Sequence, residues 1–418
     1  MRHMSIEWHE IKANSSTGCL QCLPPRDSQS SRPYETTVGF IDTNHPNYVC
    51  RLKKALYGLK QSPREWFATL SGHLQTLGFQ LSISDPSLFL YHKNGIRMFF
   101  LVYVDDILLT GNSPAALKKL LDNLNSTFTM RDLGTISQFL GIQATSTSYG
   151  LHLNQSRFAQ SILARAGMSN CKPVSTPSQL KTPTSNGLTA AYSNPAFYRQ
   201  LAGCLQYLTL TRPDIAYTVN KICQNMQNPT IQHFDNLKRL LWYIQGTLHI
   251  RLPLFRGELV LRSYTDSDWA GDTQDWKSMS GYCNFLGSSL ISWSVKKQNA
   301  VARSSTEAEY RALASAAAEV TWIRRLLQEL HCTQTTATSL FCDNTSAIAL
   351  ANNHIFHART KHIEVDCHYI RHCIKDKSIQ IHHIPTAEQL ADLLTKTLPS
   401  PRFKLLTNKL VQPMDPPP

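Results

Sequence analysis

The sequence predicts an α/β protein, and three observations lead to that fold class. Residues 98–111 read MFFLVYVDDILLTG, an apolar run typical of buried strands with two aspartates in its middle. Residues 258–297 contain three strand-like segments, and helices and strands alternate after them. Hydrophobic residues make up 42% of the 418 residues and charged residues 17%, a balance typical of a globular chain with two or three domains.

The first part of the chain changes character near residue 39. Residues 1–38 are weakly patterned and rich in Ser and Pro, so we expect them to be disordered. Residues 39–171 are periodic and predict a first domain. Its expected elements are helical segments at 51–59 and 65–77, a hairpin of strands 98–104 and 107–110, a helix opened by Ser113, a strand at 139–146 and a helix at 156–166.

The remainder divides into four segments. Residues 172–187 are rich in Pro, Ser and Thr and predict a linker, and residues 188–256 predict helices with a break at 212–215. Residues 257–400 predict a mixed-sheet α/β domain, and residues 401–418 a tail. The expected elements of that domain are strands at 258–265, 280–287 and 290–297, a helix at 306–330, a strand at 339–343, helices at 345–352 and 365–376, a strand at 379–384 and a helix at 388–396.

Asp105 and Asp106 predict a metal site at the tip of the hairpin. A buried charge is tolerated only when it is paired or bound to a metal, and carboxylate oxygens suit Mg²⁺. The alternative is an ordinary acidic turn, since Asp favours turns. Against that alternative, Asp-Asp lacks the Gly that tight hairpin turns usually place at positive φ.

Four acidic residues of the second domain lie where strands end or helices begin: Asp266, Glu309, Asp343 and Asp392. If they converge, they can hold two cations about 4 Å apart and activate a water for attack on phosphate. Each residue also has a structural interpretation. Glu309 could complete a capping box with Thr306, Asp343 could cap the following helix, and Asp392 could be a solvated helix residue.

Many short motifs of the sequence, and the order in which they occur, resemble the Pol polyproteins of Ty1/copia-type retrotransposons. The resemblance covers roughly residues 40–400 and is carried by RLKKALYGLKQSPREW, YVDDILLTGN, RDLG, FLGIQ, CKPVSTP, LTRPDIAY, TDSDWAGD, SGYCNFLG, ARSSTEAEYRAL, CDNTSAIAL, FHARTKHIEVDCHYIR and QLADLLTK. It implies an N-terminally truncated reverse transcriptase palm of α+β type, a helical thumb or connection at 188–256, and a ribonuclease H-like domain at 257–400.

For the polymerase, the resemblance implies that Asp105 and Asp106 are two of the family's three catalytic, metal-binding aspartates. The third normally lies upstream, and what precedes Gly39 does not resemble the family, so the first catalytic strand is expected to be absent or replaced. The resemblance also implies nucleic-acid or nucleotide contacts at Gly58, Lys60, Tyr103, Phe139 and Gly141. Without the resemblance, these positions have structural explanations: a helix-breaking Gly, a solvated Lys and an ordinary strand.

For the nuclease, the resemblance implies that Asp266, Glu309, Asp343 and Asp392 are catalytic metal ligands. Asp268 is an alternative to Asp266, because it is two residues further along the same strand. Many ribonucleases H carry a His in a loop before the last Asp. Here His382 and His383 are expected in a strand instead. The implied cofactors are Mg²⁺ pairs, with Mn²⁺ as an alternative, and the implied partners are an RNA–DNA hybrid, an RNA template and a DNA primer.

The charge balance agrees with a polyanionic partner, because Lys+Arg exceed Asp+Glu by 42 to 29 and give a net charge of +13. Eleven cysteines without a framework predict reduced thiols of an intracellular protein. Neither a signal peptide nor a membrane-spanning run is expected. A homodimer is left open.

Two further hypotheses remain beside a ribonuclease H whose polymerase site is incomplete. The chain could be a non-catalytic, basic nucleic-acid-binding remnant of a decayed element. A metalloprotease-like site at His368 and His372 is the weaker idea, because the Glu of the HExxH motif is missing.

Overall fold

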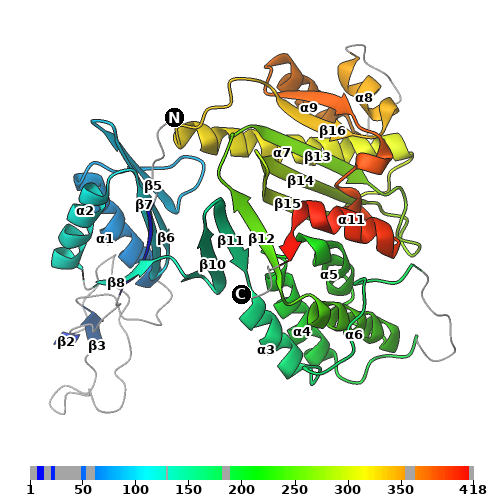
Figure 1. The fold of residues 1–418 in the computed structure, drawn as a ribbon, viewed down its shortest axis with the longest axis horizontal. Helices are drawn as coiled ribbons and strands as arrows, with labels where there is room; N and C mark the ends of the chain where they lie inside the picture. Colours follow the sequence, from blue (N-terminus) through cyan, green and yellow to red (C-terminus); the bar gives the residue numbers. More distant parts are fainter. Residues whose placement is uncertain are drawn as a thin grey trace. The chain divides into compact units, whose positions relative to one another are not determined.

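The computed structural model describes residues 7–13, 20–23, 49–52, 62–128, 130–180, 189–353 and 363–413. Contacts divide the chain into two compact units, Met1–Leu140 (unit 1) and Gly141–Pro418 (unit 2). Figure 1 shows that both contain helices and sheets, so the α/β fold class is confirmed. The division lies before the predicted end of the first domain at residue 171, and the described part of the predicted linker belongs to unit 2.

Unit 1 is built around one sheet with the strand order β4-β5-β6-β7-β1-β8. The strands are β1 (Glu7–Ala13), β4 (Gln80–Leu81), β5 (Leu88–Lys93), β6 (Ile96–Tyr103), β7 (Asp106–Gly111) and β8 (Met130–Thr135). Helices α1 (Ser62–Thr76) and α2 (Pro114–Thr127) supply leucines to its core. The predicted stripe of α2 is confirmed, because Leu117, Leu120, Leu121 and Leu124 are buried.

The expectation of disorder throughout residues 1–38 is wrong for two segments. Residues 7–13 form β1, which pairs antiparallel with β7 and with β8 inside the sheet. Ile11 is buried in the core of unit 1, which explains why this short segment is held there. Residues 20–23 form β2, paired with β3 (Val49–Leu52), so the helix expected at 51–59 begins with strand residues instead.

In unit 2, four strands lie side by side in the order β18, β12, β11, β10. They are β10 (Ile142–Thr147), β11 (Gly150–Asn154), β12 (Ile250–Phe255) and β18 (Gln412–Pro413), and β9 (Gln138–Phe139) precedes them in the chain. The helix predicted at 156–166 is confirmed as α3 (Ser156–Arg165). The helices predicted within 188–256 are confirmed as α4 (Pro195–Leu208), η1 (Pro213–Ile215), α5 (Ala216–Cys223) and α6 (Ile231–Gly246). The predicted break at 212–215 coincides with η1.

The second sheet of unit 2 has the order β15-β14-β13-β16-β17, in which β13, β14 and β15 are antiparallel and β16 and β17 are parallel to β13. The mixed sheet predicted for this region is therefore confirmed. Its elements are β13 (Leu261–Ser267), β14 (Met279–Leu286), β15 (Ser289–Lys297), α7 (Ser305–Glu329), β16 (Thr338–Cys342), α8 (Thr345–Asn352), α9 (Glu364–Lys375), β17 (Ile379–His383), η3 (Thr386–Glu388), α10 (Asp392–Thr395) and α11 (Ser400–Leu410).

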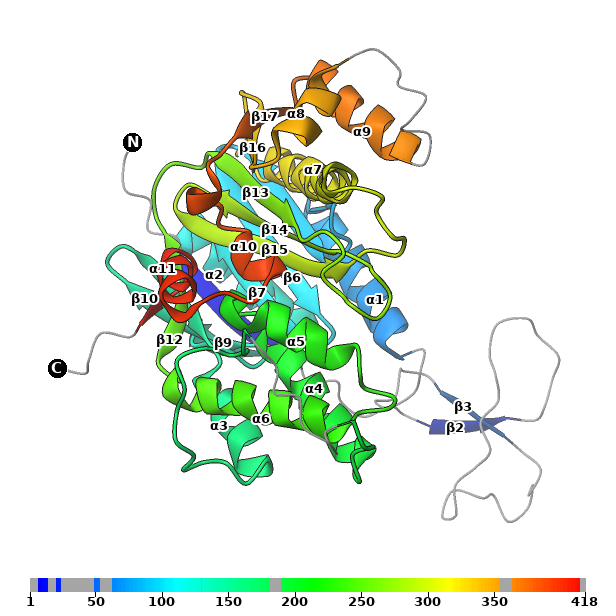
Figure 2. The same cartoon turned by 90° about the vertical axis from the view of Figure 1, so that its right-hand side faces the viewer.

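Helices cover this sheet on both faces. The buried residues of α7, α8 and α9 pack with Leu261, Leu340 and Ile379 in one core cluster. On the other face, Cys283, Phe285 and Leu290 pack with residues of α5, α10 and α11. Figures 1 and 2 show the same arrangement, with α7 running along the sheet.

Two expectations about the C-terminal end are wrong. Residues 400–410 form α11 rather than part of a tail, because Phe403, Leu406 and Leu410 are buried in the core. The helix expected at 388–396 is broken into η3 and the short α10, and Gln389 between them donates its side-chain amide to the Thr265 carbonyl at 3.0 Å. The end of the chain after residue 413 lies outside the described residues.

A buried ion pair fixes the break between α4 and α6. The Arg212 guanidinium donates to both carboxylate oxygens of Asp214, at 2.8 and 2.7 Å. The Tyr243 hydroxyl on α6 donates to the same carboxylate at 2.7 Å, and Arg212 also donates to the Thr247 carbonyl at 2.9 Å. Removing the carboxylate alone would leave a buried, uncompensated guanidinium.

We expect Asp214→Ala to lower the free energy of unfolding by about 3–5 kcal/mol, because the Arg212 charge loses its partner in the interior. Urea denaturation followed by circular dichroism measures the change. Asp235→Ala is the matched control, since its ion pair with Lys238 is exposed and should be worth about 1 kcal/mol or less. Equal losses in the two variants would contradict the role assigned to the buried pair.

Candidate functional site

Asp266 lies on β13, the central strand of the mixed sheet, and its neighbours hold it in place. Its residue is only 1% exposed, and the Thr395 hydroxyl on α10 donates to its Oδ2. The Lys396 ammonium lies 3.2 Å from the same oxygen. The carboxylate therefore faces α10 rather than solvent.

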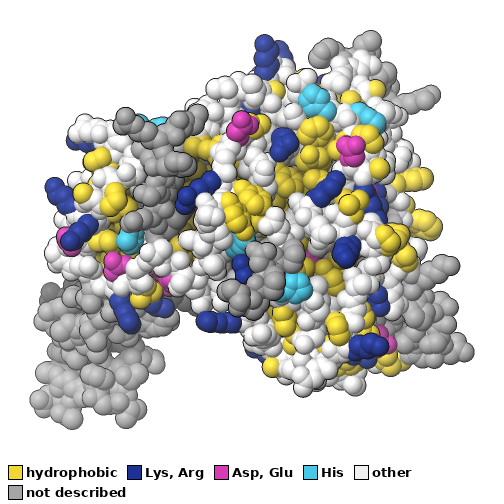
Figure 3. All heavy atoms as spheres, in the orientation of Figure 1, with side chains coloured by type: hydrophobic (Ala, Val, Ile, Leu, Met, Phe, Trp, Pro, Cys, Tyr) yellow, Lys and Arg dark blue, Asp and Glu magenta, His cyan; other side chains and the backbone are white. Residues whose placement is uncertain are grey.

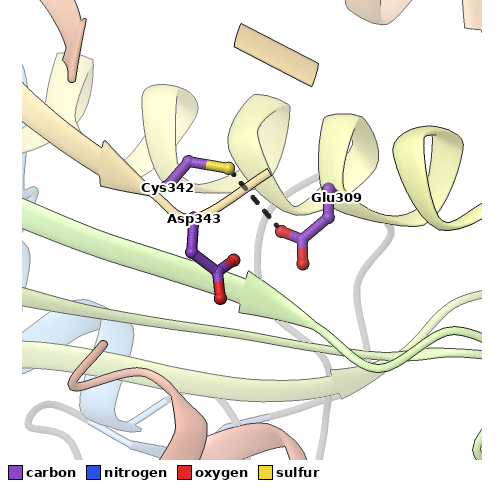
Figure 4. A group of neighbouring side chains, drawn as sticks. All are labelled: Glu309, Cys342 and Asp343. Atoms are coloured by element: carbon purple, nitrogen blue, oxygen red, sulfur yellow. Dashed lines mark hydrogen bonds between the residues drawn. The ribbon is translucent and has the colours of Figure 1, made fainter. Parts of the chain in front are cut away.

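Glu309 approaches the sheet from α7. The helix begins after Ser304, whose side chain accepts the backbone N–H of Glu307, so the capping box of Thr306 with Glu309 is wrong. Glu309 instead lies about one helical turn after the start of α7, and it is only 5% exposed. The Cys342 thiol at the end of β16 lies 3.8 Å from its Oε2, and Figure 4 shows both side chains meeting between helix and strand.

Asp343 follows directly after β16. The cap of α8 is Asn344, whose side chain accepts the Ala347 N–H at 2.9 Å, so the capping interpretation of Asp343 is wrong. Asp343 is free to turn toward Glu309, and ligand atoms of Glu309, Cys342 and Asp343 all lie within 4.8 Å of one another. The Thr386 hydroxyl donates to Asp343 Oδ2 at 2.9 Å.

Asp392 begins α10 and is buried, at 4% exposure, so its interpretation as a solvated residue is wrong. Lys396 Nζ lies 2.8 Å from its Oδ1, and Arg402 Nη2 on α11 lies 3.2 Å from its Oδ2. Lys396 thus joins Asp392 to Asp266. The position of α10 depends on Gly281 of β14, because a Cβ there would lie 2.7 Å from Leu394 Cβ.

Burial and mutual repulsion change the acidity of this cluster. Burial, followed by the charges of Asp266 and Asp343, raises the pKa of Glu309 to about 9. Burial is also the largest cause of the raised pKa of Asp266, which Lys396 opposes. Asp266 and Asp343 lie close enough to act on Glu309, and Asp392 close enough to act on Asp266. The predicted convergence of four carboxylates is therefore present in the geometry.

Asp268 is a poorer candidate than Asp266. It lies beyond the end of β13 and accepts the backbone N–H of Met279. Burial raises its pKa to about 6. A carboxylate already engaged with the backbone has fewer lone pairs to offer to a cation.

The donor set of this cluster fits a hard divalent cation. It consists of carboxylate oxygens, which Mg²⁺ and Mn²⁺ prefer. Burial raises the pKa of the Cys342 thiol well above its usual range, so the sulfur stays protonated and is a poor ligand for such ions. A bound cation would take the place of the proton that the raised pKa favours on Glu309.

The hairpin of unit 1 has a different turn from the expected one. Tyr103 pairs with Asp106, so the turn residues are Val104 and Asp105. Val104 takes φ of 53°, a left-handed conformation that is rare for a β-branched residue. The Trp66 indole N–H on α1 donates to the Val104 carbonyl at 2.9 Å and helps to hold this turn.

Strand β1 pairs with β7 beside the hairpin aspartates, and it brings a lysine. Lys12 faces Asp106 in the register, and its Nζ is 3.7 Å from Asp106 Oδ1. Glu10, two residues earlier on the same strand, is the upstream carboxylate of that face. Burial is the largest cause that raises the pKa of Glu10, and the charge of Asp106 raises it as well. A backbone hydrogen bond from Gln138 and the charge of Lys12 oppose this rise. Burial and Asp106 likewise raise the pKa of Asp105. A donor set with its own ammonium group does not fit a pair of divalent cations.

The other predicted contact residues have mixed outcomes. Gly58 and Lys60 lie outside the described residues. Tyr103 is exposed beside the turn. Phe139 ends β9 and is half-buried. Gly141 has φ of 74°, and a Cβ there would lie 2.9 Å from the Tyr207 hydroxyl.

Among the residues that the structure describes, the histidines do not gather into a metal site. His382 and His383 belong to β17, as predicted. His368 Nε2 lies 3.7 Å from Glu364 and His372 Nε2 lies 3.0 Å from Asp376, so each forms its own ion pair on α9. Every cysteine whose side chain the structure describes is free. Within the described ranges, none of the helices is both long and apolar enough for a membrane span.

Lys396, Thr395 and Cys342 were missed as neighbours of the carboxylates. The spacing of Asp392 and Lys396 in QLADLLTK, four residues apart, is the signal that could have identified the lysine, because such residues share a helix face. On the face drawn in Figure 3, Lys and Arg side chains are scattered rather than gathered in one stripe. The surface charge alone therefore does not single out a binding path.

Comparisons with known proteins place the chain in a class. The family described as reverse transcriptase (RNA-dependent DNA polymerase) matches residues 34–180. The retrovirus-related Pol polyprotein from transposon RE1 of Arabidopsis thaliana is 46% identical over 404 residues, which is 96% of this chain and 27% of that protein. An uncharacterized mitochondrial protein of Arabidopsis thaliana is 52% identical over 226 residues, 54% of this chain and 94% of that protein.

The chain belongs to the Pol polyproteins of copia-type retrotransposons. It spans about a quarter of the length of the retrotransposon Pol polyproteins it matches. Among solved structures, LC11-RNase H1 in complex with an RNA/DNA hybrid is similar at a TM-score of 0.25 and 14% identity, covering 32% of this chain and 93% of that one. The family assignment rests on the sequence relatives.

Glu309 should make the stability of the metal-free protein depend on pH. Its pKa rises from 4.5 to about 9 on folding, so the folded state binds the extra proton. The stabilisation is complete below pH 4.5 and is lost as the pH rises toward 9. In EDTA, we expect the wild-type Tm to fall more steeply over this range than the Tm of Glu309→Gln.

Thermal unfolding at several pH values measures the two slopes. Glu388→Gln serves as the control, because Glu388 is exposed on η3, and it should follow the wild type. Identical slopes for wild type and Glu309→Gln would show that the Glu309 carboxyl does not hold its proton in the folded state.

Proposed function

We propose that residues 257–400 form a ribonuclease H-like domain that cleaves the RNA strand of RNA–DNA hybrids with divalent metal. The observation that carries the proposal is the convergence of Asp266, Glu309, Asp343 and Asp392 from a central strand, a long helix, a neighbouring strand end and α10. Such a cluster can bind hard cations beside a scissile phosphate. Bound Mg²⁺ or Mn²⁺ would supply an activated water and neutralise charge on the phosphate.

The residues of the chain have separate roles in this proposal. Glu309 and Asp343 would hold a cation, since their oxygens lie within reach of each other. Asp266 would orient the site from the sheet, and the Thr395 hydroxyl would fix its rotamer. Arg402 would position Asp392 through its contact at 3.2 Å. The net charge of +13 favours binding of the hybrid's phosphates.

Metal-dependent cleavage of an RNA–DNA hybrid is the test. With Mg²⁺ or Mn²⁺, we expect the purified chain to cut the RNA strand, and Asp343→Asn to reduce the rate by about 100-fold or more because a metal ligand is lost. Denaturing gels of a labelled RNA strand give the rates. Asp376→Asn, an exposed position on the C-terminal side of α9, should cut like the wild type.

The competing hypothesis is a nucleic-acid-binding remnant without turnover, and the ion pairs of Lys396 inside the cluster favour it. In that case hybrid binding would fall steeply with salt, but the RNA strand would stay intact. Absence of cleavage in a folded sample, or equal cleavage by Asp343→Asn, would reject the ribonuclease proposal. The homodimer stays a prediction.

For the reverse transcriptase unit, we propose that polymerisation is lost. Of the two hairpin carboxylates, Asp106 faces Lys12 on β1 and lies 3.7 Å from its ammonium group. Primer extension on an RNA template should therefore be undetectable, as measured by incorporation of labelled nucleotide. Extension by the pure chain would show that Glu10, or another upstream carboxylate, completes the site.

A further inference from the structure

One half of the carboxylate cluster already contains a cation. Lys396 Nζ lies 3.2 Å from Asp266 Oδ2 and 2.8 Å from Asp392 Oδ1. It also lies 3.4 Å from Asp266 Oδ1. A divalent ion shared by Asp266 and Asp392 would need oxygens at about 2.0–2.1 Å for Mg²⁺. It would therefore occupy the space that the ammonium group takes.

Two further side chains contact the carboxylates of this half. Thr395 donates its hydroxyl to Asp266, and Arg402 pairs with Asp392 Oδ2 at 3.2 Å. Two positive side chains therefore balance two carboxylates. This half is close to electroneutral without any metal.

The other half has no such balance. Glu309 is contacted by the Cys342 thiol and Asp343 by the Thr386 hydroxyl, both neutral groups. In the described part of the chain, neither carboxylate forms an ion pair within 4.0 Å, whereas their ligand atoms lie within 4.8 Å of each other. A cation would therefore be stabilised mainly by Glu309 and Asp343.

The fold keeps Lys396 in place. It directly follows α10, and its backbone N–H donates to the Asp392 carbonyl at 3.2 Å. Leu394 of α10 packs so close to β14 that only the missing side chain of Gly281 admits it. Its ion-pair partners are Asp266 and Asp392, although the lysine side chain keeps 36% of its surface exposed.

Building on the proposed ribonuclease function, we propose that Lys396 is the resident cation of the Asp266–Asp392 half of the cluster. The protein without nucleic acid then binds one divalent cation, through Glu309 and Asp343, instead of two. Lys396 is a positioning residue in this proposal, since it acts on the metal through the carboxylates.

The test counts Mn²⁺ ions on the full chain by electron paramagnetic resonance, without nucleic acid. We expect one mononuclear ion per wild-type chain, and none at this site in Asp343→Asn. Lys396→Met should bind two ions, whose separation of about 4 Å gives a spin-coupled signal. Lys396→Arg keeps the charge and should bind one. Lys409→Met, at an exposed lysine of α11, is the matched control and should also bind one.

The outcomes separate this proposal from the function on which it rests. Two coupled ions in the wild type would overturn the role of Lys396 but leave the ribonuclease proposal intact. No ion that depends on Asp343 would overturn both. One ion in a folded Lys396→Met would overturn the lysine assignment alone. If Lys396→Met does not fold, Lys396→Gln takes its place under the same criteria, and the wild-type count still decides between one ion and two.

Discussion

The mixed-sheet domain of unit 2 depends on placing several carboxylates in a space with little water. Three of them are almost completely buried, on a strand, a long helix and a short helix. Like charges at such positions repel each other and lose hydration, so each must be neutralised by a proton, a side-chain cation or a metal. The structure uses the first two: a proton favoured on Glu309, and Lys396 with Arg402 around Asp266 and Asp392. Gly281 of β14 and the helices α10 and α11 position the side chains that provide this charge balance.

The reverse transcriptase unit shows the opposite relation between fold and chemistry. A sheet needs backbone partners for its strands, and β1 meets that need although only one of its residues, Ile11, is known to be buried in the core. The same strand places Lys12 beside Asp106, one of the two hairpin carboxylates. The backbone pairing of the sheet does not depend on this side chain, whereas the proposed loss of polymerisation does.

Much of the fold could be predicted because local residue patterns determine its helices and strands. The stripe of α2, the alternation of strands and helices after residue 258 and the break at 212–215 follow from apolar spacing and from proline. The errors have physical reasons. β1 is a polar segment that only the neighbouring strands make regular, and α11 is held by contacts with residues far away in the sequence. The four carboxylates were identified from sequence motifs of the family. The role of Lys396 could be recognised only from the structure, because it depends on which side chains meet across β13, β14 and α10.

The close approach of α10 to Gly281 has a genetic consequence. Glycine there carries no charge, yet a methyl group at that position would push against the helix that positions both Asp392 and Lys396. A single nucleotide substitution in the glycine codon would thus disturb the proposed nuclease site while every acidic codon stayed intact. Inventories of decayed elements that count only catalytic acids would score such a copy as functional.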